Sequence, residues 1–249
     1  MLKSKKLWLW MIIGFLAVVV IGVAVWFFGV HLPRQRAHEE HKRQVAAYTN
    51  AKLTQYEEEN AKYDDYEVDV AFLGDSLTDG YDVAAYYPQY LVSNRGIGGD
   101  TTFTLEDRLQ VSVYDLKPKV AVLLIGGNNL QSMFDNYEDI LLGFQENMPQ
   151  TKVVLVSLIS MSKDWGKGNE LAAYNNVKIK LLADKYGYEF VDLYSPLFDL
   201  QTGEMYEQYS EDGAHQTPEG YEVFTAQITP ALERLLGPGN TGIDNEETT

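Results

Sequence analysis

The sequence predicts an α/β protein, in which a three-layer, doubly wound parallel sheet follows a single transmembrane helix. Short apolar runs alternate with stretches whose apolar residues recur at helical spacing, which is the order of elements in such a sheet. Several of these runs contain no polar residue, as expected for strands buried on both faces. The 24 residues from 7 to 30 carry no charge, which predicts the membrane helix.

Charge is distributed unevenly along the 249 residues, whose formal net charge is −16. Residues 1–63 carry a net charge of +4, so residues 64–249 carry −20. A domain this acidic repels the phosphates of nucleic acids, and no basic stripe offsets the repulsion, so nucleic-acid binding is excluded. The chain has no cysteine, which also excludes disulfides, a catalytic thiol and thiolate metal sites.

The apolar run over residues 7–30 is predicted to be an uncleaved membrane anchor. As a helix it would span about 36 Å, enough to cross a bilayer with some tilt, with Trp8, Trp10 and Trp26 near its two interfaces. The alternative is a cleaved signal peptide, which has a shorter apolar region followed by a site of small residues. The one near match to such a site, residues 22–24, lies inside the run.

The direction of the anchor is predicted from the tail that precedes it. Residues 1–6 contain three lysines, but four Arg and Lys residues follow the helix within residues 34–43, so the positive charges on the two sides do not decide. A short, lysine-rich tail is typical of an anchor whose N-terminus stays in the cytoplasm. We therefore expect a single-pass protein of the cell membrane with its main domain outside the cytoplasm.

Residues 31–65 are predicted to form a solvated helical stalk between the anchor and the main domain. The segment is rich in Ala, Glu, Gln, Lys and Arg, which favour helix. Val45, Tyr48, Lys52 and Tyr56 would share one face of that helix. A short coiled coil is the alternative, although this apolar seam is brief.

The first chemical motif of the main domain follows a predicted buried strand at residues 68–73. Residues 74–80 read Gly-Asp-Ser-Leu-Thr-Asp-Gly, and the glycines allow a tight turn from strand to helix. Ser76 stands at the turn, where its hydroxyl can face a cleft while its N–H begins the next helix and can bind a developing oxyanion. Taken alone, Gly-Asp-Ser is a weak signal, because small polar turns after strands are common.

A glycine cluster comes next, at residues 94–102, before a predicted helix that runs to about Leu116. It resembles a dinucleotide-binding fingerprint, but Thr101 stands where the third glycine is required, so that interpretation is rejected. Glycines here can bring a bare backbone N–H close to a ligand. Asp100 or Thr101 could cap the helix that follows.

A third motif follows the apolar run at residues 120–125, which is typical of a central parallel strand. The run ends in Gly-Gly-Asn-Asn, and Asn128 would lie at the carboxyl edge of the sheet, where open α/β folds bind ligands. The alternative is that Asn128 only caps the loop by bonding to backbone.

The remaining elements complete the alternation of strand and helix. Residues 135–147 and 169–186 are predicted helices, and residues 152–159 and 189–193 are predicted strands. The loop at residues 160–168 is polar apart from Met161 and Trp165.

The last motif lies in a loop before the final helix, predicted to run from Pro218 to about Leu236 with Thr217 as its N-cap. Asp212 and His215 are three residues apart in this loop, and His215 is the only histidine of the main domain. A histidine beside an aspartate is a candidate general base. Residues 237–249 are expected to be disordered.

Together, the motifs at Gly74-Asp75-Ser76-Leu77, residues 94–101, Gly126-Gly127-Asn128 and residues 212–215 resemble those of the SGNH hydrolases, also called the GDSL esterase/lipase family. They occur in the family's order and cover about residues 66–236. Within the family, the chain looks most similar to the bacterial thioesterase/lysophospholipase and platelet-activating-factor acetylhydrolase-like branches. The resemblance implies a flavodoxin-like sheet.

The resemblance also implies the roles of the site residues. Ser76 would be the nucleophile, His215 its general base and Asp212 the residue that orients the imidazole. The N–H groups of Ser76 and Gly99 and the amide of Asn128 would form the oxyanion hole. The order Ser…Asp…His also matches the α/β-hydrolases, but their Gly-x-Ser-x-Gly motif is missing.

Two further features of the sequence concern the environment of these site residues. The family commonly has Asp after the third motif's Asn, whereas this chain has Asn129, which affects a supporting hydrogen bond. Asp75, Asp79 and Asp82 form an acidic cluster, but Leu77 breaks the pattern of a calcium loop, so no metal or other cofactor is expected. Asp79 and Asp82 are expected to be turn and cap residues.

These observations predict a membrane-anchored serine ester hydrolase that forms an acyl-enzyme on small or short-chain carboxylic esters. O-acetylated glycans and lipid-derived esters are the expected substrates, and Met161 and Trp165 are candidates to contact them. One alternative is a lysophospholipase or thioesterase for longer acyl chains. The other is a catalytically retired, membrane-tethered binding protein.

Overall fold

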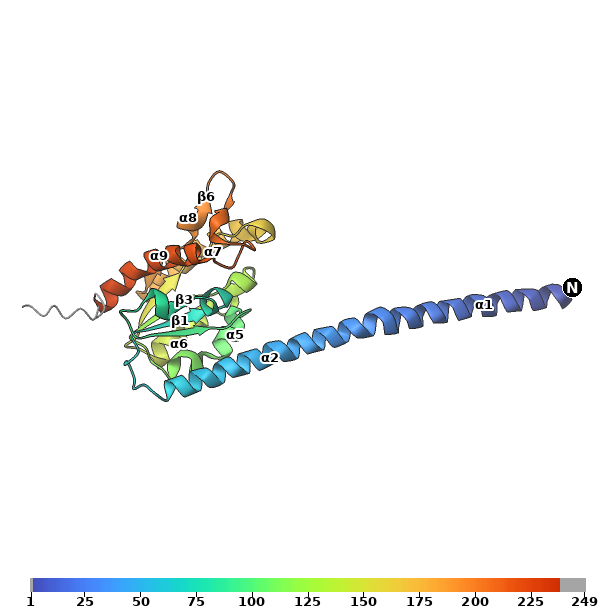
Figure 1. The fold of residues 1–249 in the computed structure, drawn as a ribbon, viewed down its shortest axis with the longest axis horizontal. Helices are drawn as coiled ribbons and strands as arrows, with labels where there is room; N and C mark the ends of the chain where they lie inside the picture. The colour runs from blue at the N-terminus through green and yellow to red at the C-terminus, as the bar shows by residue number, and fades with distance from the viewer. Residues whose placement is uncertain (1, 238–249) are drawn as a thin grey trace, which may run out of the picture. The chain divides into compact units, whose positions relative to one another are not determined.

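The computed structural model describes residues 2–237, and the predicted disordered tail, residues 237–249, lies outside them except for Gly237. The chain divides into two compact units, Met1–Ala51 and Lys52–Thr249. The first unit is helical and the second holds the sheet (Figure 1).

The first unit consists of α1 (Leu2–Trp26), a π-helical turn η1 (Phe27–His31) and most of α2 (Leu32–Asn60). Trp8 and Phe15 are among the large apolar side chains that α1 exposes. One helical stretch of the described chain is long and apolar enough to cross a membrane by length and composition, a test that an N-terminal signal sequence also passes.

The second unit is built on a five-stranded parallel sheet with the strand order β2-β1-β3-β4-β5. Val70 of the interior strand β1 pairs with Val92 on one side and Val120 on the other. This confirms the predicted doubly wound α/β sheet. The strands are β1 (Val70–Gly74), β2 (Val92–Gly96), β3 (Val120–Leu124), β4 (Lys152–Val156) and β5 (Glu189–Val191).

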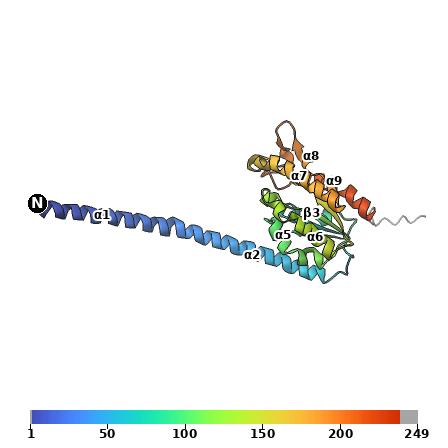
Figure 2. The same cartoon turned by 180° about the vertical axis from the view of Figure 1, so that it is seen from behind.

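Helices cover both faces of the sheet and make the outer two of the three layers. Figure 1 shows α9 over one face and α6 over the other, and Figure 2 shows the same arrangement from behind. A two-stranded hairpin, β6–β7, lies outside the main sheet. The helices of this unit are α3 (Ser76–Asp79), α4 (Val83–Tyr86), α5 (Thr102–Asp107), α6 (Tyr137–Asn147), α7 (Asn169–Tyr186), α8 (Tyr194–Leu197) and α9 (Pro218–Leu236). The short turns are η2 (Gln110–Tyr114), η3 (Gly127–Asn129), η4 (Met133–Asp135), η5 (Lys163–Gly168) and η6 (Glu207–Tyr209), and the hairpin strands are β6 (Phe198–Asp199) and β7 (Glu204–Met205).

The core forms where the apolar runs of the sequence become strands. Every residue of β1 and β3 is buried, as expected for strands covered on both faces. The last helix begins as predicted, because Thr217 accepts a hydrogen bond from Gly220 N–H and Pro218 occupies the first helical position. Of the two candidate caps of α5, it is Thr101 that caps the helix, in a reciprocal capping box with Thr104.

Strand β2 was not predicted, because its residues are mostly polar. Asn94 donates hydrogen bonds to the carbonyl oxygens of Thr78 and Tyr81 at 2.6 and 2.8 Å. Arg95 is completely buried and donates to Ser93 Oγ at 2.6 Å. These partners bond several polar groups of an edge strand that no apolar pattern marks, although Nη2 of Arg95 has no hydrogen-bond partner and only an ion-pair contact with Glu59.

The last turns of α2 belong to the second unit, which begins at Lys52 rather than at the predicted boundary after residue 65. Tyr56 is fully buried, and its ring centre lies 4.8 Å from the guanidinium carbon of Arg95. Glu59 faces the same guanidinium, with its carboxylate 3.4 Å from Arg95 Nη2. One face of this end of the helix is therefore packed against the domain, while Thr54, Gln55, Glu57 and Glu58 stay exposed.

We expect a fragment that begins at Asp64 to be less stable than one that begins at Ala46 by at least about 3 kcal/mol. The shorter fragment lacks the Tyr56 ring and the Glu59 carboxylate, and the buried Arg95 loses its compensating partner. Urea unfolding of both fragments measures the difference. Equal free energies of unfolding would show that α2 contributes nothing to the fold of the domain.

Candidate active site

Ser76 is the first residue of α3, two residues after Gly74, the last residue of the interior strand β1. Asp75 precedes it as the N-cap, and its carboxylate accepts a hydrogen bond from Leu77 N–H at 3.0 Å. This cap turns the chain sharply at the carboxyl edge of the sheet. Ser76 is thereby presented at the place where ligands bind in open α/β folds.

Ser76, His215 and Asp212 form a continuous hydrogen-bonded chain. His215 Nδ1 lies 2.6 Å from Asp212 Oδ2, and His215 Nε2 lies 2.9 Å from Ser76 Oγ. A carboxylate can only accept, so Nδ1 carries the ring proton, and Nε2 of the neutral ring accepts from the serine hydroxyl. The imidazole is therefore placed to take up the proton of Ser76.

The loop of Asp212 holds this carboxylate in its ionised form. Partial burial alone would raise the pKa of Asp212, but hydrogen bonds from the ring of His215 and from the N–H groups of Ala214 and His215 outweigh it. They hold the pKa well below its usual range. Asp212 therefore remains an anion that orients the ring and favours the imidazolium.

The two other predicted oxyanion donors flank Ser76 on neighbouring loops. Asn128 follows β3, and its amide nitrogen donates to Asp100 O at 2.9 Å, with only a long contact of 3.5 Å to Asp75 Oδ2. Gly99 follows β2 with a φ of +84°, a left-handed conformation that favours glycine. A Cβ atom added at the adjacent Gly98 would lie 3.9 Å from Ser76 Cβ, so this loop passes beside the serine.

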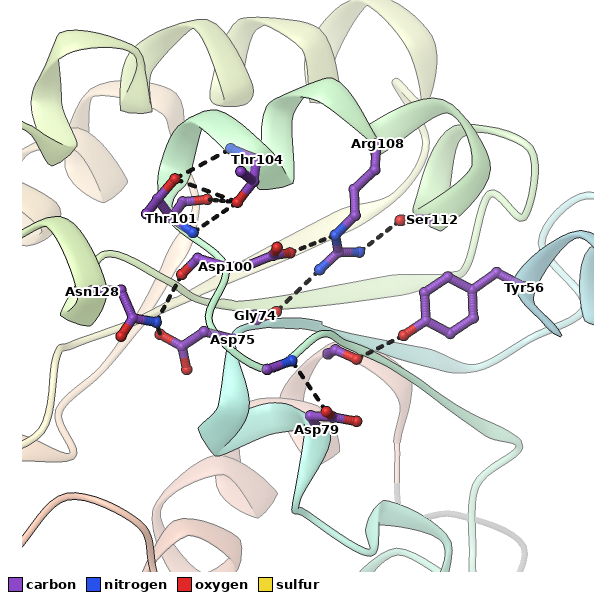
Figure 3. A network of polar contacts seen from close by, with 12 residues as sticks. Tyr56, Gly74, Asp75, Asp79, Asp100, Thr101, Thr104, Arg108, Ser112 and Asn128 are labelled. Carbon is purple, nitrogen blue, oxygen red and sulfur yellow. Dashed lines mark hydrogen bonds and ion pairs between the residues drawn. The ribbon is translucent and has the colours of Figure 1, made fainter. Parts of the chain in front are cut away.

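Arg108, which sequence reasoning missed, lies beneath these loops in a buried polar network (Figure 3). Its Nε donates to the carboxylate of Asp100 at 2.6 Å. Its two other nitrogens donate to Ser112 Oγ at 2.7 Å and to Gly74 O at 3.1 Å. The arginine therefore ties the end of β1 to the loop that contains Gly99.

A small cavity opens beside Ser76 and His215, with a volume of about 60 Å³. On the same measure a single water needs about 10–15 Å³, so the cavity holds only a few heavy atoms. Apart from Ser76, His215, Asp75, Asn128 and Gly127, its lining is apolar. The apolar members are Leu77, Leu124, Leu130, Leu158, Ile159, Met161, Trp165 and Ala214.

Met161 and Trp165, the two residues predicted to contact substrate, both line this cavity. Met161 is buried, and Asn169 bonds to its backbone N–H and carbonyl at 2.7 and 2.8 Å. Trp165 is 49% exposed and also lines a larger open groove with Gln131 and Lys167. The cavity therefore leads outward past the indole into a wide, partly polar groove.

Comparison with known proteins decides what kind of protein has this geometry. The sequence profile of the GDSL-like lipase/acylhydrolase family matches residues 72–223. The chain belongs to this family. The matched region contains Ser76, Asn128 and His215, and membership makes the protein a carboxylic ester hydrolase of the GDSL type. Among curated proteins, none matches the sequence.

Solved structures share the fold along nearly their whole length. A GDSL-like lipase from Bacteroides thetaiotaomicron is 26% identical, with a TM-score of 0.66, and the match covers 74% of this chain and 98% of that one. A Streptococcus pneumoniae structure, provisionally described as a platelet activating factor, is 23% identical with a TM-score of 0.71, over 80% and 99% of the two chains. An acetylxylan esterase from Geobacillus stearothermophilus is 19% identical with a TM-score of 0.56, over 70% and 96%.

Three details of this GDSL hydrolase differ from, or add to, the interpretation of its sequence. Asp82 caps α4, as predicted, but Asp79 is more than a turn residue, because it pairs with Lys52 at 2.6 Å. Asn129, which replaces the family's usual Asp, accepts from Thr102 N–H at 3.3 Å and donates to Thr102 Oγ1 at 2.9 Å. The amide thus holds the start of α5.

Among residues 2–237, no three His, Asp or Glu side chains are grouped to hold a metal ion.

Asp75 is a buried carboxyl group at the centre of this site. Burial raises its pKa to about 6, and the negative charge of Asp100 also raises the pKa. The hydrogen bond from Leu77 N–H and the charge of His215 lower the pKa, but they are outweighed. The unfolded chain releases this proton near pH 4, whereas the folded protein keeps it until about pH 6. Stability is therefore lost as the pH rises through this window and stays lower above it.

We measure the effect of Asp75→Asn as the change that it causes in the free energy of unfolding. This change should be more favourable at pH 8 than at pH 4 by on the order of 3 kcal/mol. The amide keeps the acceptor for Leu77 N–H and cannot ionise. Urea unfolding of the wild type and the Asp75→Asn variant at the two pH values measures this. A difference in stability that does not change with pH would show that Asp75 titrates normally.

Proposed function

We propose that this protein is a membrane-anchored serine ester hydrolase that cleaves short-chain carboxylic esters through an acyl-enzyme. One observation carries the proposal: the hydrogen-bonded chain from Asp212 through His215 to Ser76 ends at the mouth of a small apolar cavity. The chain supplies an activated nucleophile, and the cavity has room for a short acyl group.

In the proposed reaction, Ser76 Oγ attacks the ester carbonyl carbon and its proton passes to His215 Nε2. The C–O bond to the alcohol then breaks, and the imidazolium returns the proton to the leaving oxygen. Water attacks the acyl-enzyme with His215 again as the base, which releases the acid and restores Ser76. Asp212 stabilises the imidazolium in both steps and keeps the ring in the productive tautomer.

The oxyanion that forms in each step would be bound by the N–H groups of Ser76 and Gly99 and by the amide of Asn128. The two loops that carry Gly99 and Asn128 are held together by the hydrogen bond from the Asn128 amide to Asp100 O. The second amide hydrogen of Asn128, which makes only a 3.5 Å contact with Asp75, is then the one that turns to the oxyanion.

O-acetylated glycans are the substrate class that the groove beside Trp165 favours. The exposed indole offers an apolar face on which a sugar ring can stack, while Gln131 and Lys167 offer hydrogen-bond donors in the same groove. The acetyl group would then enter the small cavity. The acetylxylan esterase of the same fold is a precedent for such a substrate.

We further propose that residues 7–30 anchor the enzyme in the cell membrane, with residues 1–6 in the cytoplasm and the hydrolase domain outside. The helix α1 exposes large apolar side chains such as Trp10 and Phe15, which suit a lipid environment. The helix α2 then carries the chain to the domain. This arrangement would keep the cleft near esters of the cell envelope.

Ser76→Ala should lower the esterase rate at least about a thousandfold without unfolding the protein, because the half-buried hydroxyl contributes little packing. Hydrolysis of p-nitrophenyl acetate and labelling by a fluorophosphonate probe both report the loss. Ser195→Ala, which changes an exposed serine on α8, is the matched control and should keep full activity. Normal labelling of the Ser76→Ala variant would mean that another residue is the nucleophile.

Acyl-chain preference tests the size of the cavity. We expect kcat/KM on p-nitrophenyl esters to be highest between acetyl and butyryl and to fall at least about tenfold by ten carbons, because longer chains do not fit. Met161→Ala enlarges the cavity and should shift the optimum to longer acyl groups. A wild-type maximum at about ten carbons or beyond would instead support the lysophospholipase or thioesterase alternative.

A further inference from the structure

The last turns of α2 reach the loop that connects β2 to α5, which contains Gly99. Tyr56 is fully buried, and its hydroxyl donates to Gly96 O at 2.7 Å (Figure 3). One helical turn earlier, Lys52 Nζ lies 2.6 Å from Asp79 Oδ1. The other oxygen of Asp79 accepts from Gly98 N–H at 3.1 Å. Two side chains of α2 therefore act on this region: Tyr56 holds Gly96 at the end of β2, where the loop begins, and Lys52 holds Gly98 through Asp79.

Gly99 lies between two residues of the loop that are held from different sides. Gly98 N–H is held by Asp79. Asp100 is held by Arg108 through its carboxylate and by Asn128 through its carbonyl oxygen. Because the residues before and after Gly99 are both anchored, the direction of the Gly99 N–H depends on both anchors. The anchor on the Gly98 side leads back to α2.

Asp79 also connects this loop to the nucleophile. It is the last residue of α3, which begins with Ser76, and its N–H donates to Asp75 O at 2.9 Å. The contact between loop and helix is tight, because a Cβ atom added at Gly96 would lie 2.2 Å from Asp79 N. The carboxylate of Asp79 therefore sets the spacing between the two backbone N–H donors of the proposed oxyanion hole.

The charge of Lys52 matters as well as its position. The side chains of Lys52 and Asp79 are 22% and 15% exposed, so the pair is only weakly screened by solvent. Without the ammonium group, Asp79 would be a poorly solvated anion on the helix that begins with Ser76. An anion there that has lost this counter-charge opposes the negative charge that develops on the substrate oxygen.

We propose that Lys52 and Tyr56 are positioning residues of the active site, which hold the loop of Gly99 in the geometry that binds the oxyanion. The inference rests on the proposed function, in which the Gly99 N–H is an oxyanion donor. The end of α2 is then part of the catalytic structure as well as the connection to the N-terminal unit.

The test uses full-length protein in detergent micelles and the variants Tyr56→Phe and Lys52→Met. Each removes a polar group while keeping most of the side-chain volume. We expect kcat on p-nitrophenyl acetate to fall about threefold to tenfold for Tyr56→Phe and at least about tenfold for Lys52→Met, with KM changed less than about twofold. Lys52→Arg keeps the charge and should recover most of the rate.

A second measurement separates positioning from a general loss of structure. An alkylboronic acid forms a tetrahedral, anionic adduct on a catalytic serine, so its inhibition constant reports the oxyanion site. We expect this constant to rise in proportion to the loss of kcat. Thermal unfolding identifies a temperature at which all variants are folded, and the assays are run there.

Two matched controls change the same residue types away from the loop. Tyr90→Phe removes a hydroxyl that donates to Gly237 O at 2.8 Å, and Lys42→Met removes the partner of an exposed Glu39. Both should leave kcat and the boronate constant unchanged.

The outcomes distinguish this proposal from the proposed function. If Ser76→Ala is inactive but Tyr56→Phe and Lys52→Met keep the wild-type kcat and boronate constant, the positioning role is wrong and the serine mechanism stands. The role is also wrong if the controls lose as much activity as the test variants, or if only KM changes. If Ser76→Ala keeps full activity, the proposed function itself fails.

Discussion

The buried guanidinium of Arg108 is the contact on which the arrangement of this site depends. It donates hydrogen bonds to the end of β1 at Gly74, to the carboxylate of Asp100 after β2 and to Ser112 in η2. Arg108 and Asp100 are 5% and 6% exposed, and removal of one member of such a buried pair typically costs about 3–5 kcal/mol. The two chain segments that flank the nucleophile cannot separate without exposing or orphaning this charge.

The strand order explains why these segments meet. Because β1 lies between β2 and β3, the loops after all three strands converge at the carboxyl edge with Ser76 in the middle. The Asn128 amide joins the loop after β3 to the loop after β2 by its hydrogen bond to Asp100 O. His215 arrives from the opposite end of the domain sequence, 139 residues after Ser76, on the loop that precedes α9.

The helix α9 places that loop by packing against the helix of the nucleophile. Tyr221 donates to Leu77 O at 3.0 Å, and its ring stacks on Tyr81 with the centres 4.7 Å apart. Thr217 caps the helix only a few residues after His215. His215 and Ser76 are therefore connected through α3 and α9 as well as by their own hydrogen bond. The contacts of Tyr221 with Leu77 and Tyr81 therefore both pack the core and fix the geometry of the site.

Local patterns in the sequence determined the elements that depend on nearest neighbours. Apolar runs predicted the strands β1 and β3, since burial on both faces leaves no room for polar residues. The mostly apolar β4 and the short edge strand β5, which contains Glu189, were predicted from the alternation of strands and helices. The Thr217-Pro218 pair predicted the start of α9, because a cap acts within a single turn. The small polar residues after two strands predicted Ser76 and Asn128 as site candidates, and the Asp212–His215 pair in the loop before the last helix predicted His215.

Only the tertiary structure decided the elements whose stability comes from partners far along the chain. Strand β2 has a polar sequence, and it becomes a strand because Tyr56 and Glu59 accommodate Arg95. Asp79 looked like a turn residue because its partner Lys52 lies 27 positions earlier, in a helix with no chemical motif. A periodic or capping pattern records only local geometry. Pairing of buried charges depends on which distant segments the fold brings together, and no local pattern encodes that.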